Sequence, residues 1–143
     1  MTVKAILDSK GSDVATIEPT ANLASAVKSL AAHRIGALVV TGHSQQVAGI
    51  ISERDIIRAL AESGAAALEQ SVDQVMTRKV ITCTRRETIS GIMERMTDGK
   101  FRHLPVVEEG RLRGIVSIGD VVKHRVREIE FESASLRDYI RTA

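Results

Sequence analysis

The sequence predicts an α/β fold of the α+β kind, in which two βαββα repeats pack with pseudo-twofold symmetry and a C-terminal helix follows. Three observations predict it: an internal repeat, helical spacing of apolar residues in each copy, and paired apolar segments around a polar turn after each helix. Residues 14–40 align with residues 80–106 without a gap. We place the first repeat at residues 1–63, the second at 64–127 and a helical extension at 128–143.

The first helix of each repeat has apolar residues at i, i+3, i+4 and i+7, which predicts one buried face. These residues are Leu23, Ala26, Val27 and Leu30 in the first repeat and Ile89, Ile92, Met93 and Met96 in the second. Asn22 and Thr88 stand just before the two helices, where a side-chain oxygen can accept a hydrogen bond from a free amide. Both helices are therefore fixed at their starts.

Two short strands and a second helix complete each repeat. The matching segments are residues 37–40 with 104–107, 47–51 with 112–116, and 52–60 with 117–126. The lead-in at residues 2–7 resembles that at residues 71–76. A unit of about 60 residues is marginally stable alone, so we expect the two repeats to pack together and leave clefts between them. Helical spacing of Ile129, Ser133, Leu136 and Ile140 predicts a terminal helix, which we place at a homodimer interface.

The composition excludes several function classes. The chain has 43% hydrophobic and 27% charged residues with a net charge of +2, which is typical of one globular unit. Twenty basic against eighteen acidic residues, with three aromatic residues, argue against a nucleic-acid partner. No apolar run approaches the roughly 20 residues of a membrane helix. The single cysteine cannot form an internal disulfide, so we expect a cytoplasmic protein.

Two heptapeptides, GIISERD at residues 49–55 and GIVSIGD at residues 114–120, occupy the same place in the two repeats. The segments HRIGALVV from His33 and FRHLPVV from Phe101 precede them. In these motifs the chain, from residue 3 to about residue 127, resembles a tandem pair of cystathionine-β-synthase (CBS) domains, a Bateman module, in a stand-alone bacterial-type signalling protein. The resemblance implies that an adenine nucleotide (AMP, ADP, ATP or NAD(H)) binds in the clefts, without a catalytic cofactor.

Ser52 with Asp55, and Ser117 with Asp120, stand where a strand becomes a helix. One interpretation is a helix cap, in which Ser accepts from a helical amide and the acid suits the positive helix end. In the other, the carboxylate accepts from both ribose hydroxyls while Ser and the helix amides face a phosphate. We favour the second, because Gly49 or Gly114 would let a ligand approach the backbone.

Arg34 and Lys100 occupy one repeat position, at the turn after the first helix. They are either solvated cations or, as the resemblance implies, phosphate ligands, with the guanidinium better suited to a polyphosphate. Strand alternation is expected to send Arg102 and His103 to opposite faces, with at least one in the cleft. The full set of predicted nucleotide-binding residues is Thr16, Ile17, His33, Arg34, Ile35, Gly36, Ala37, Ser52, Arg54, Asp55, Thr82, Cys83, Lys100, Phe101, Arg102, His103, Pro105, Ser117, Gly119 and Asp120.

These residues predict a sensor that binds an adenine nucleotide and passes its state to an unknown protein effector. The chain has no GxxxxGK[ST] loop, no GxGxxG after a strand and no HExxH, so we expect neither an enzyme nor a metal site. The alternative is a structural or protein-interaction module with empty clefts, in which the Ser–Asp pairs act only as caps. Nucleotide binding separates the two hypotheses.

Overall fold

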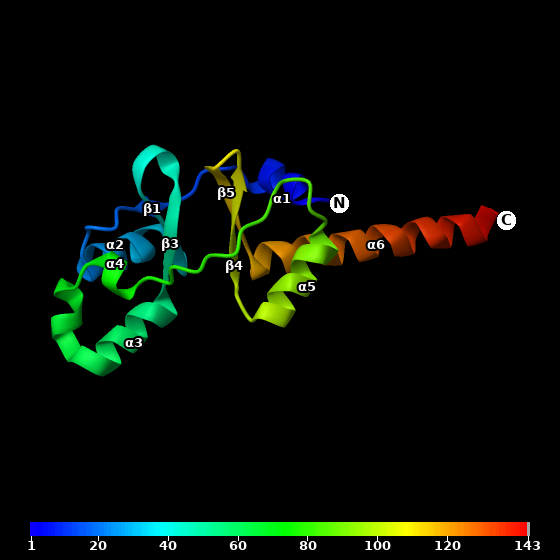
Figure 1. The fold of residues 1–143 in the computed structure, drawn as a ribbon. Coiled ribbons are helices and arrows are strands. Elements are labelled where there is room, and N and C mark those ends of the chain that lie inside the picture. Colours follow the sequence, from blue (N-terminus) through cyan, green and yellow to red (C-terminus); the bar gives the residue numbers. More distant parts are fainter. Residues whose placement is uncertain (143) are drawn as a thin grey trace.

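The computed structural model describes residues 1–142, and its ribbon shows two lobes and a long projecting helix (Figure 1). Mixed helices and strands recur in the predicted order, which confirms the α+β class. The first half contains α1 (Val3–Lys10), β1 (Thr16–Ile17), α2 (Leu23–His33), β2 (Ala37–Thr41), η1 (His43–Gln45), β3 (Val47–Ser52), α3 (Glu53–Ser63) and η2 (Gly64–Glu69). The second contains α4 (Val72–Val75), α5 (Ile89–Gly99), β4 (His103–Glu108), β5 (Arg111–Ser117) and α6 (Ile118–Thr142).

The two sheets are equivalent but not identical. In the first, β1 pairs parallel with β2, and β2 pairs antiparallel with β3. In the second, β4 pairs antiparallel with β5, and the first strand of the expected βαββα order is reduced to one parallel bridge between Cys83 and Val106. Each antiparallel pair has a register shift at the same repeat position, at Val40 and at Val106. The two repeats therefore share the same irregularity in their strand pairing.

The helix starts confirm the expected caps. The side chain of Asn22 accepts from the Ser25 amide at 2.9 Å, and that of Thr88 accepts from the Gly91 amide at 3.1 Å. The predicted faces are buried, except that Val27 is 39% exposed and Met93 is only partly buried. Three buried apolar residues attach each helix to its core, and the fourth, Val27 or Met93, lies at the edge of the apolar stripe.

The lobes exchange their lead-in helices, which the sequence alone did not predict. In Figure 1, α1 lies with β4, β5 and α5, whereas α4 lies with β3 and α3. Val3, Ile6 and Leu7 belong to the core formed by residues 83–121, and Val72 and Met76 belong to the core formed by residues 23–67. Each packing unit thus contains part of the other sequence repeat, and separating the repeats would expose both cores.

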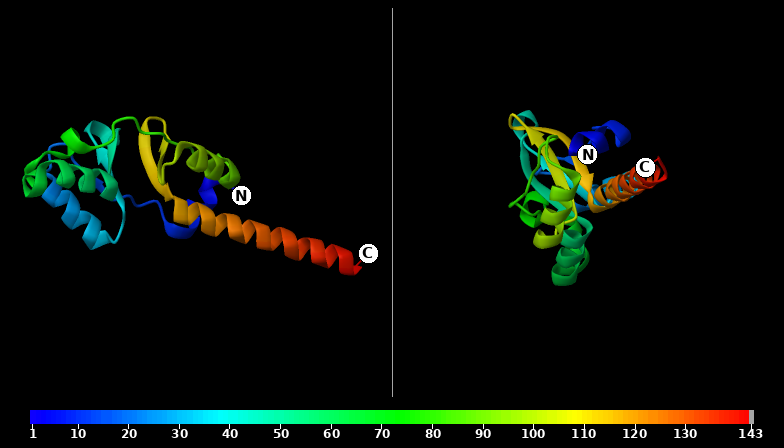
Figure 2. Two further views of the ribbon diagram at one scale, coloured as in Figure 1. Left: turned by 90° about the horizontal axis from the view of Figure 1, so that it is seen from below. Right: turned by 90° about the vertical axis from the view of Figure 1, so that its right-hand side faces the viewer.

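The expected terminal helix and the second helix of the second repeat form one helix, α6. No glycine or proline interrupts residues 120–142, so nothing ends the helix between them. Figure 2 shows that its C-terminal part extends away from both lobes. No helix among residues 1–142 is long and apolar enough to cross a membrane.

Candidate functional site

A cleft of about 560 Å³ lies between the two repeats. One wall is the start of α3 with the preceding strand, and the other is the segment from the end of α5 into β4. The lining residues are Gly36, Ile50, Ser52, Glu53, Arg54, Asp55, Ile57, Arg58, Thr77, Lys79, Val80, Ile81, Lys100, Phe101, Arg102 and His103. The volume lies within the range of small-molecule sites, about 300–1,000 Å³.

Asp55 is the carboxylate at the centre of the first wall, and only 6% of it is exposed. The Ser52 amide and hydroxyl donate to its Oδ2 at 2.9 and 3.0 Å, and the Asp55 amide is 3.3 Å from Ser52 Oγ. This reciprocal capping box confirms that the Ser–Asp pair caps α3. The other oxygen, Oδ1, accepts from Thr77 Oγ1 at 3.2 Å and lies 3.8 Å from an Arg58 nitrogen. Oδ1 is therefore less fully occupied than Oδ2, and the carboxylate keeps capacity to accept.

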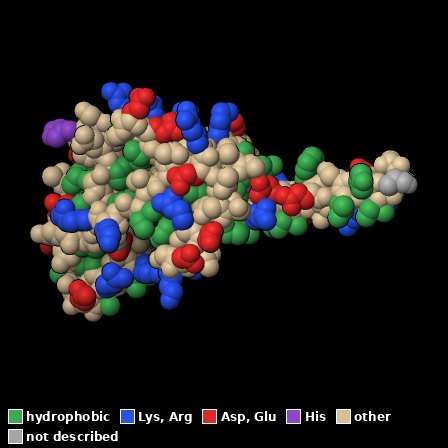
Figure 3. All heavy atoms as spheres, turned by 45° about the vertical axis from the view of Figure 1, so that its right-hand side comes forward, with side chains coloured by type: hydrophobic (Ala, Val, Ile, Leu, Met, Phe, Trp, Pro, Cys, Tyr) green, Lys and Arg blue, Asp and Glu red, His purple; other side chains and the backbone are tan. Residues whose placement is uncertain are grey.

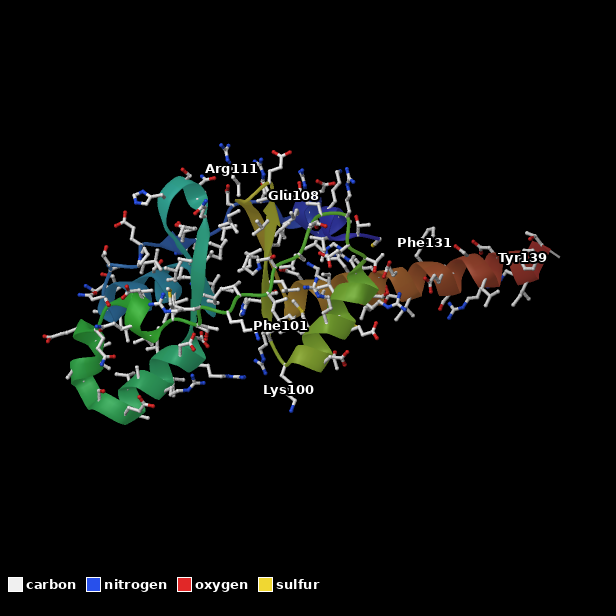
Figure 4. The ribbon with its side chains drawn as sticks, viewed as in Figure 1. Lys100, Phe101, Glu108, Arg111, Phe131 and Tyr139 are labelled. Atoms are coloured by element: carbon white, nitrogen blue, oxygen red, sulfur yellow. The ribbon has the colours of Figure 1, made fainter. Side chains whose placement is uncertain are left out.

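The second wall is cationic and has an unusual backbone. Lys100 ends α5 in the left-handed conformation (φ 57°, ψ 32°), as Arg34 ends α2 (φ 55°, ψ 47°). Figure 4 shows Lys100 and Phe101 at the turn between α5 and β4. Non-glycine residues rarely adopt this conformation, and such residues cluster at functional sites. The match between the two turns confirms that Arg34 and Lys100 occupy one repeat position.

Arg102 and His103 both line the cleft, so the expectation that they face opposite ways is wrong. Strand β4 begins only at His103, so alternation does not apply to Arg102. Burial is the main cause that lowers the pKa of His103, and the nearby cations of Lys10 and Arg102 lower it further. His103 is therefore neutral at neutral pH. The lining of the cleft that it shares contains five Lys or Arg residues and two acidic residues.

The equivalent carboxylate of the second repeat is engaged differently. Ser117 and Asp120 form the same reciprocal pair, with distances of 2.9 and 3.1 Å. Lys10 Nζ, from α1, also donates to Asp120 Oδ2 at 2.7 Å. Burial acts to raise the pKa of Asp120, but the hydrogen bonds from Lys10 and Ser117 bring the pKa below its ordinary value. The Lys10 ammonium thus already donates to the carboxylate that was expected to accept from ribose hydroxyls.

The cleft gathers eight of the predicted residues: Gly36, Ser52, Arg54, Asp55, Lys100, Phe101, Arg102 and His103. The others lie outside its lining: Thr16, Ile17, His33, Arg34, Ile35, Ala37, Thr82, Cys83, Pro105, Ser117, Gly119 and Asp120. Cys83 is buried, and its amide and carbonyl are both paired, with Pro105 and Val107. Burial raises the pKa of its thiol to about 12.

Sequence reasoning missed the segment that forms the floor of the cleft, from Thr77 to Ile81. This segment follows α4. Because α4 packs on the core of the first repeat, the segment begins beside that repeat, where Thr77 forms a bridge with Ile50. Ile81 is 41% exposed and supplies an apolar surface, while Lys79 adds a cation. Ile81, an apolar residue in a largely polar linker, was the feature of the sequence that could have indicated a place in the cleft.

Comparison with known proteins places this architecture in a family. The model of the CBS domain matches residues 3–62 and 72–127. The chain is 42% identical over 119 residues to the mitochondrial CBS domain-containing protein CBSX3 of Arabidopsis thaliana, covering 80% of this chain and 58% of that protein.

Solved structures share the fold. The CBS-domain containing protein ATU1752 from Agrobacterium tumefaciens is 51% identical with a TM-score of 0.84, over 87% of this chain and 99% of that one. The CBS domain pair of MJ0100, in complex with 5′-methylthioadenosine and S-adenosyl-L-methionine, is 27% identical with a TM-score of 0.79, over 90% and 98% of the two chains. This chain belongs to the CBS-domain family and carries two such domains in tandem.

Proposed function

We propose that the chain is a sensor that binds an adenine nucleotide in the cleft between Asp55 and Lys100 and passes its state to a protein partner. The observation that carries the proposal is the gathering, in one 560 Å³ cleft, of a carboxylate from one repeat and a cationic turn from the other. Asp55 would accept from the ribose hydroxyls, and Lys100 with Arg102 would bind the phosphate. Binding of adenosyl ligands by the related MJ0100 pair supports the class of ligand.

The lining explains how each part of a nucleotide would be held. The start of α3 presents its positive dipole end to the cleft, which favours an anion there, while the Glu53 and Asp55 amides already donate to the Gly36 carbonyl and to Ser52 Oγ. Ile57, 65% exposed, and Ile81 offer apolar surface to a purine. The excess of cations favours nucleotides with more than one phosphate over an uncharged nucleoside. We propose in addition that the sensor has no catalytic activity and, from the lone cysteine, that it is cytoplasmic.

The alternative, a structural module with empty clefts, is favoured by one observation. Both carboxylates already accept hydrogen bonds from the chain, Asp55 from Ser52 and Thr77, and Asp120 from Ser117 and Lys10. Isothermal titration calorimetry with AMP, ADP, ATP and NADH separates the two. We expect binding of at least one of them at one site per chain. Absence of heat and of any thermal shift with all four would support the structural module.

Replacing Lys100 with glycine should raise stability and weaken binding together. Glycine adopts the left-handed conformation without the cost of about 1 kcal/mol that an L side chain bears there, so the melting temperature should rise by roughly 2–4 °C. Nucleotide affinity should fall several-fold as the cation is lost. Arg34→Gly is the matched control: it has the same backbone gain but lies outside the cleft lining, and its affinity should be unchanged. A Lys100→Gly variant that binds as tightly as the wild type contradicts the phosphate role.

Nucleotide affinity should rise as the pH falls from about 8 to about 6. Burial and neighbouring cations lower the pKa of His103 in the free protein, so it is neutral there. A bound phosphate favours the imidazolium, raises the pKa and takes up a proton, so binding strengthens at lower pH. His103→Gln should lose this dependence, whereas titration of the nucleotide's own phosphate is common to both proteins. Identical pH profiles would place His103 away from the phosphate.

A further inference from the structure

Within the described residues 1–142, the C-terminal part of α6 packs against no other element that would explain its stability. Every residue from Ile129 to Thr142 is exposed, and this part of the helix extends beyond the lobes (Figures 2 and 3). An isolated helix of about 12–15 residues is marginal in water, because most helix stability comes from packing of an apolar face. The projecting segment therefore needs a partner.

An apolar seam runs along α6 with alternating spacings of four and three residues. Its members are Val122, Val126, Ile129, Ser133, Leu136 and Ile140. The five apolar members are 43–66% exposed, whereas Val121 and His124 pack against the second repeat. The seam thus begins beside the lobe and continues along the projecting helix. A repeat of 3.5 residues per turn is the pattern of a left-handed coiled coil, with Val126, Ser133 and Ile140 at its a positions.

We propose that a second copy of this chain covers the seam and forms a parallel, in-register, two-stranded coiled coil with it. The charges beside the seam favour this partner. In a parallel pair, a residue at position g faces a residue at position e of the next heptad on the other helix. Arg125, which donates to Glu128 Oε1 of its own helix at 3.1 Å, would then also face the partner's Glu130, and Glu132 would face the partner's Arg137. Both contacts are attractive, and symmetry makes each occur twice.

The opposite orientation is disfavoured by the same side chains. An antiparallel pair over the same six layers would set Glu130 against Glu130 and Glu132 against Glu132, with Lys123 against Arg137. Each of these contacts is repulsive. Ser133 occupies an a position. One polar residue in an apolar seam favours alignment with its own copy, so Ser133 would help to fix the register of the two helices. This dimer does not depend on nucleotide binding, so the two proposals can fail separately.

Cysteine crosslinking of the full chain tests the geometry. Ser133→Cys places a thiol against its own copy in the parallel dimer, whereas Ser135→Cys lies on the outer face and is the matched control. The native Cys83 is 2% exposed and does not compete. Under mild oxidation we expect the Ser133→Cys dimer to form about tenfold faster or more, because the helices hold the thiols at high effective concentration. Equal rates for the two variants would overturn the proposal.

A second substitution shows whether the seam causes the proximity. In the Ser133→Cys background, Leu136→Asp should abolish rapid crosslinking, whereas Phe131→Ser should not. Phe131 is 72% exposed, more than Leu136, but lies off the seam on the projecting part of α6 (Figure 4). Glu132→Arg and Arg137→Glu should each slow crosslinking, and the double variant should restore it. Equal behaviour of the Leu136 and Phe131 variants, or no restoration, would contradict the parallel pair.

Discussion

Asp55→Ala is expected to weaken nucleotide binding by about a hundredfold. The carboxylate would accept charge-assisted hydrogen bonds from the ribose, each contributing roughly 1.5–3 kcal/mol. Loss of the capping box should also cost about 1–2 kcal/mol of folding stability, because the Ser52 amide loses its acceptor. Calorimetry gives the affinity, and thermal unfolding gives the stability.

Two variants separate the binding effect from the folding effect. Asp73→Ala removes a carboxylate that accepts from Ser71 at the start of α4, outside the cleft, and should leave the affinity unchanged. Asp55→Asn keeps the volume and one acceptor oxygen, and should recover stability more than affinity. If Asp55→Ala binds with the wild-type affinity while it remains folded, the ribose assignment is wrong.

Gly49→Ala is expected to cost about 3 kcal/mol of folding free energy, roughly 6–12 °C in melting temperature. A Cβ at this position would lie 2.7 Å from Met76 Sδ and 2.7 Å from the Thr77 carbonyl oxygen. That carbonyl accepts from the Ile50 amide at 3.0 Å, so it cannot withdraw without breaking the bridge between β3 and the cleft floor. Urea unfolding measures the loss.

The equivalent Gly114→Ala provides the internal comparison. There the added Cβ would meet Leu7 Cδ2 at 2.7 Å, the end of a flexible side chain that can rotate. We expect a cost of about 1–2 kcal/mol, smaller than at Gly49. An equal or larger loss for Gly114→Ala would show that the backbone contact of Thr77 does not restrict the first site.

These contacts correct one expectation from the sequence. We expected Gly49 and Gly114 to let a ligand approach the backbone, but atoms of the exchanged lead-in segments fill that space. The missing side chain permits a close approach, but the group that approaches belongs to this chain and not to a ligand. The motif could not identify what approaches, since the answer depends on which repeat each lead-in joins.

Local rules predicted the local structure well. Helix periodicity and cap residues placed α2 and α5, and the repeat placed Arg34 and Lys100 at equivalent turns, as the matching backbone angles confirm. The sequence also selected residues from both repeats that the fold gathers in one cleft, among them Asp55, Lys100 and His103. The helices and their caps follow from short-range spacing, whereas the choice of cleft residues rested on the resemblance to CBS-domain pairs.

Long-range packing was the part that spacing could not predict. The exchange of α1 and α4 brings Thr77–Ile81 into the cleft and sets Lys10 against Asp120. Two repeats that look equivalent in sequence therefore present two different carboxylates, one lining a cleft and one held by an ammonium. An alignment of the repeats hides this asymmetry, because it does not show which core each lead-in helix joins.

The most direct test of the nucleotide site is a crystal structure of the chain grown with the nucleotide, among AMP, ADP, ATP and NADH, that binds most tightly in calorimetry. We expect one nucleotide between the repeats, with its ribose hydroxyls within hydrogen-bond distance of Asp55 and its phosphates beside Lys100 and Arg102. A nucleotide bound elsewhere, or an unfilled cleft at a saturating concentration of that nucleotide with Asp55 still contacted only by Ser52, Thr77 and Arg58, would contradict the account.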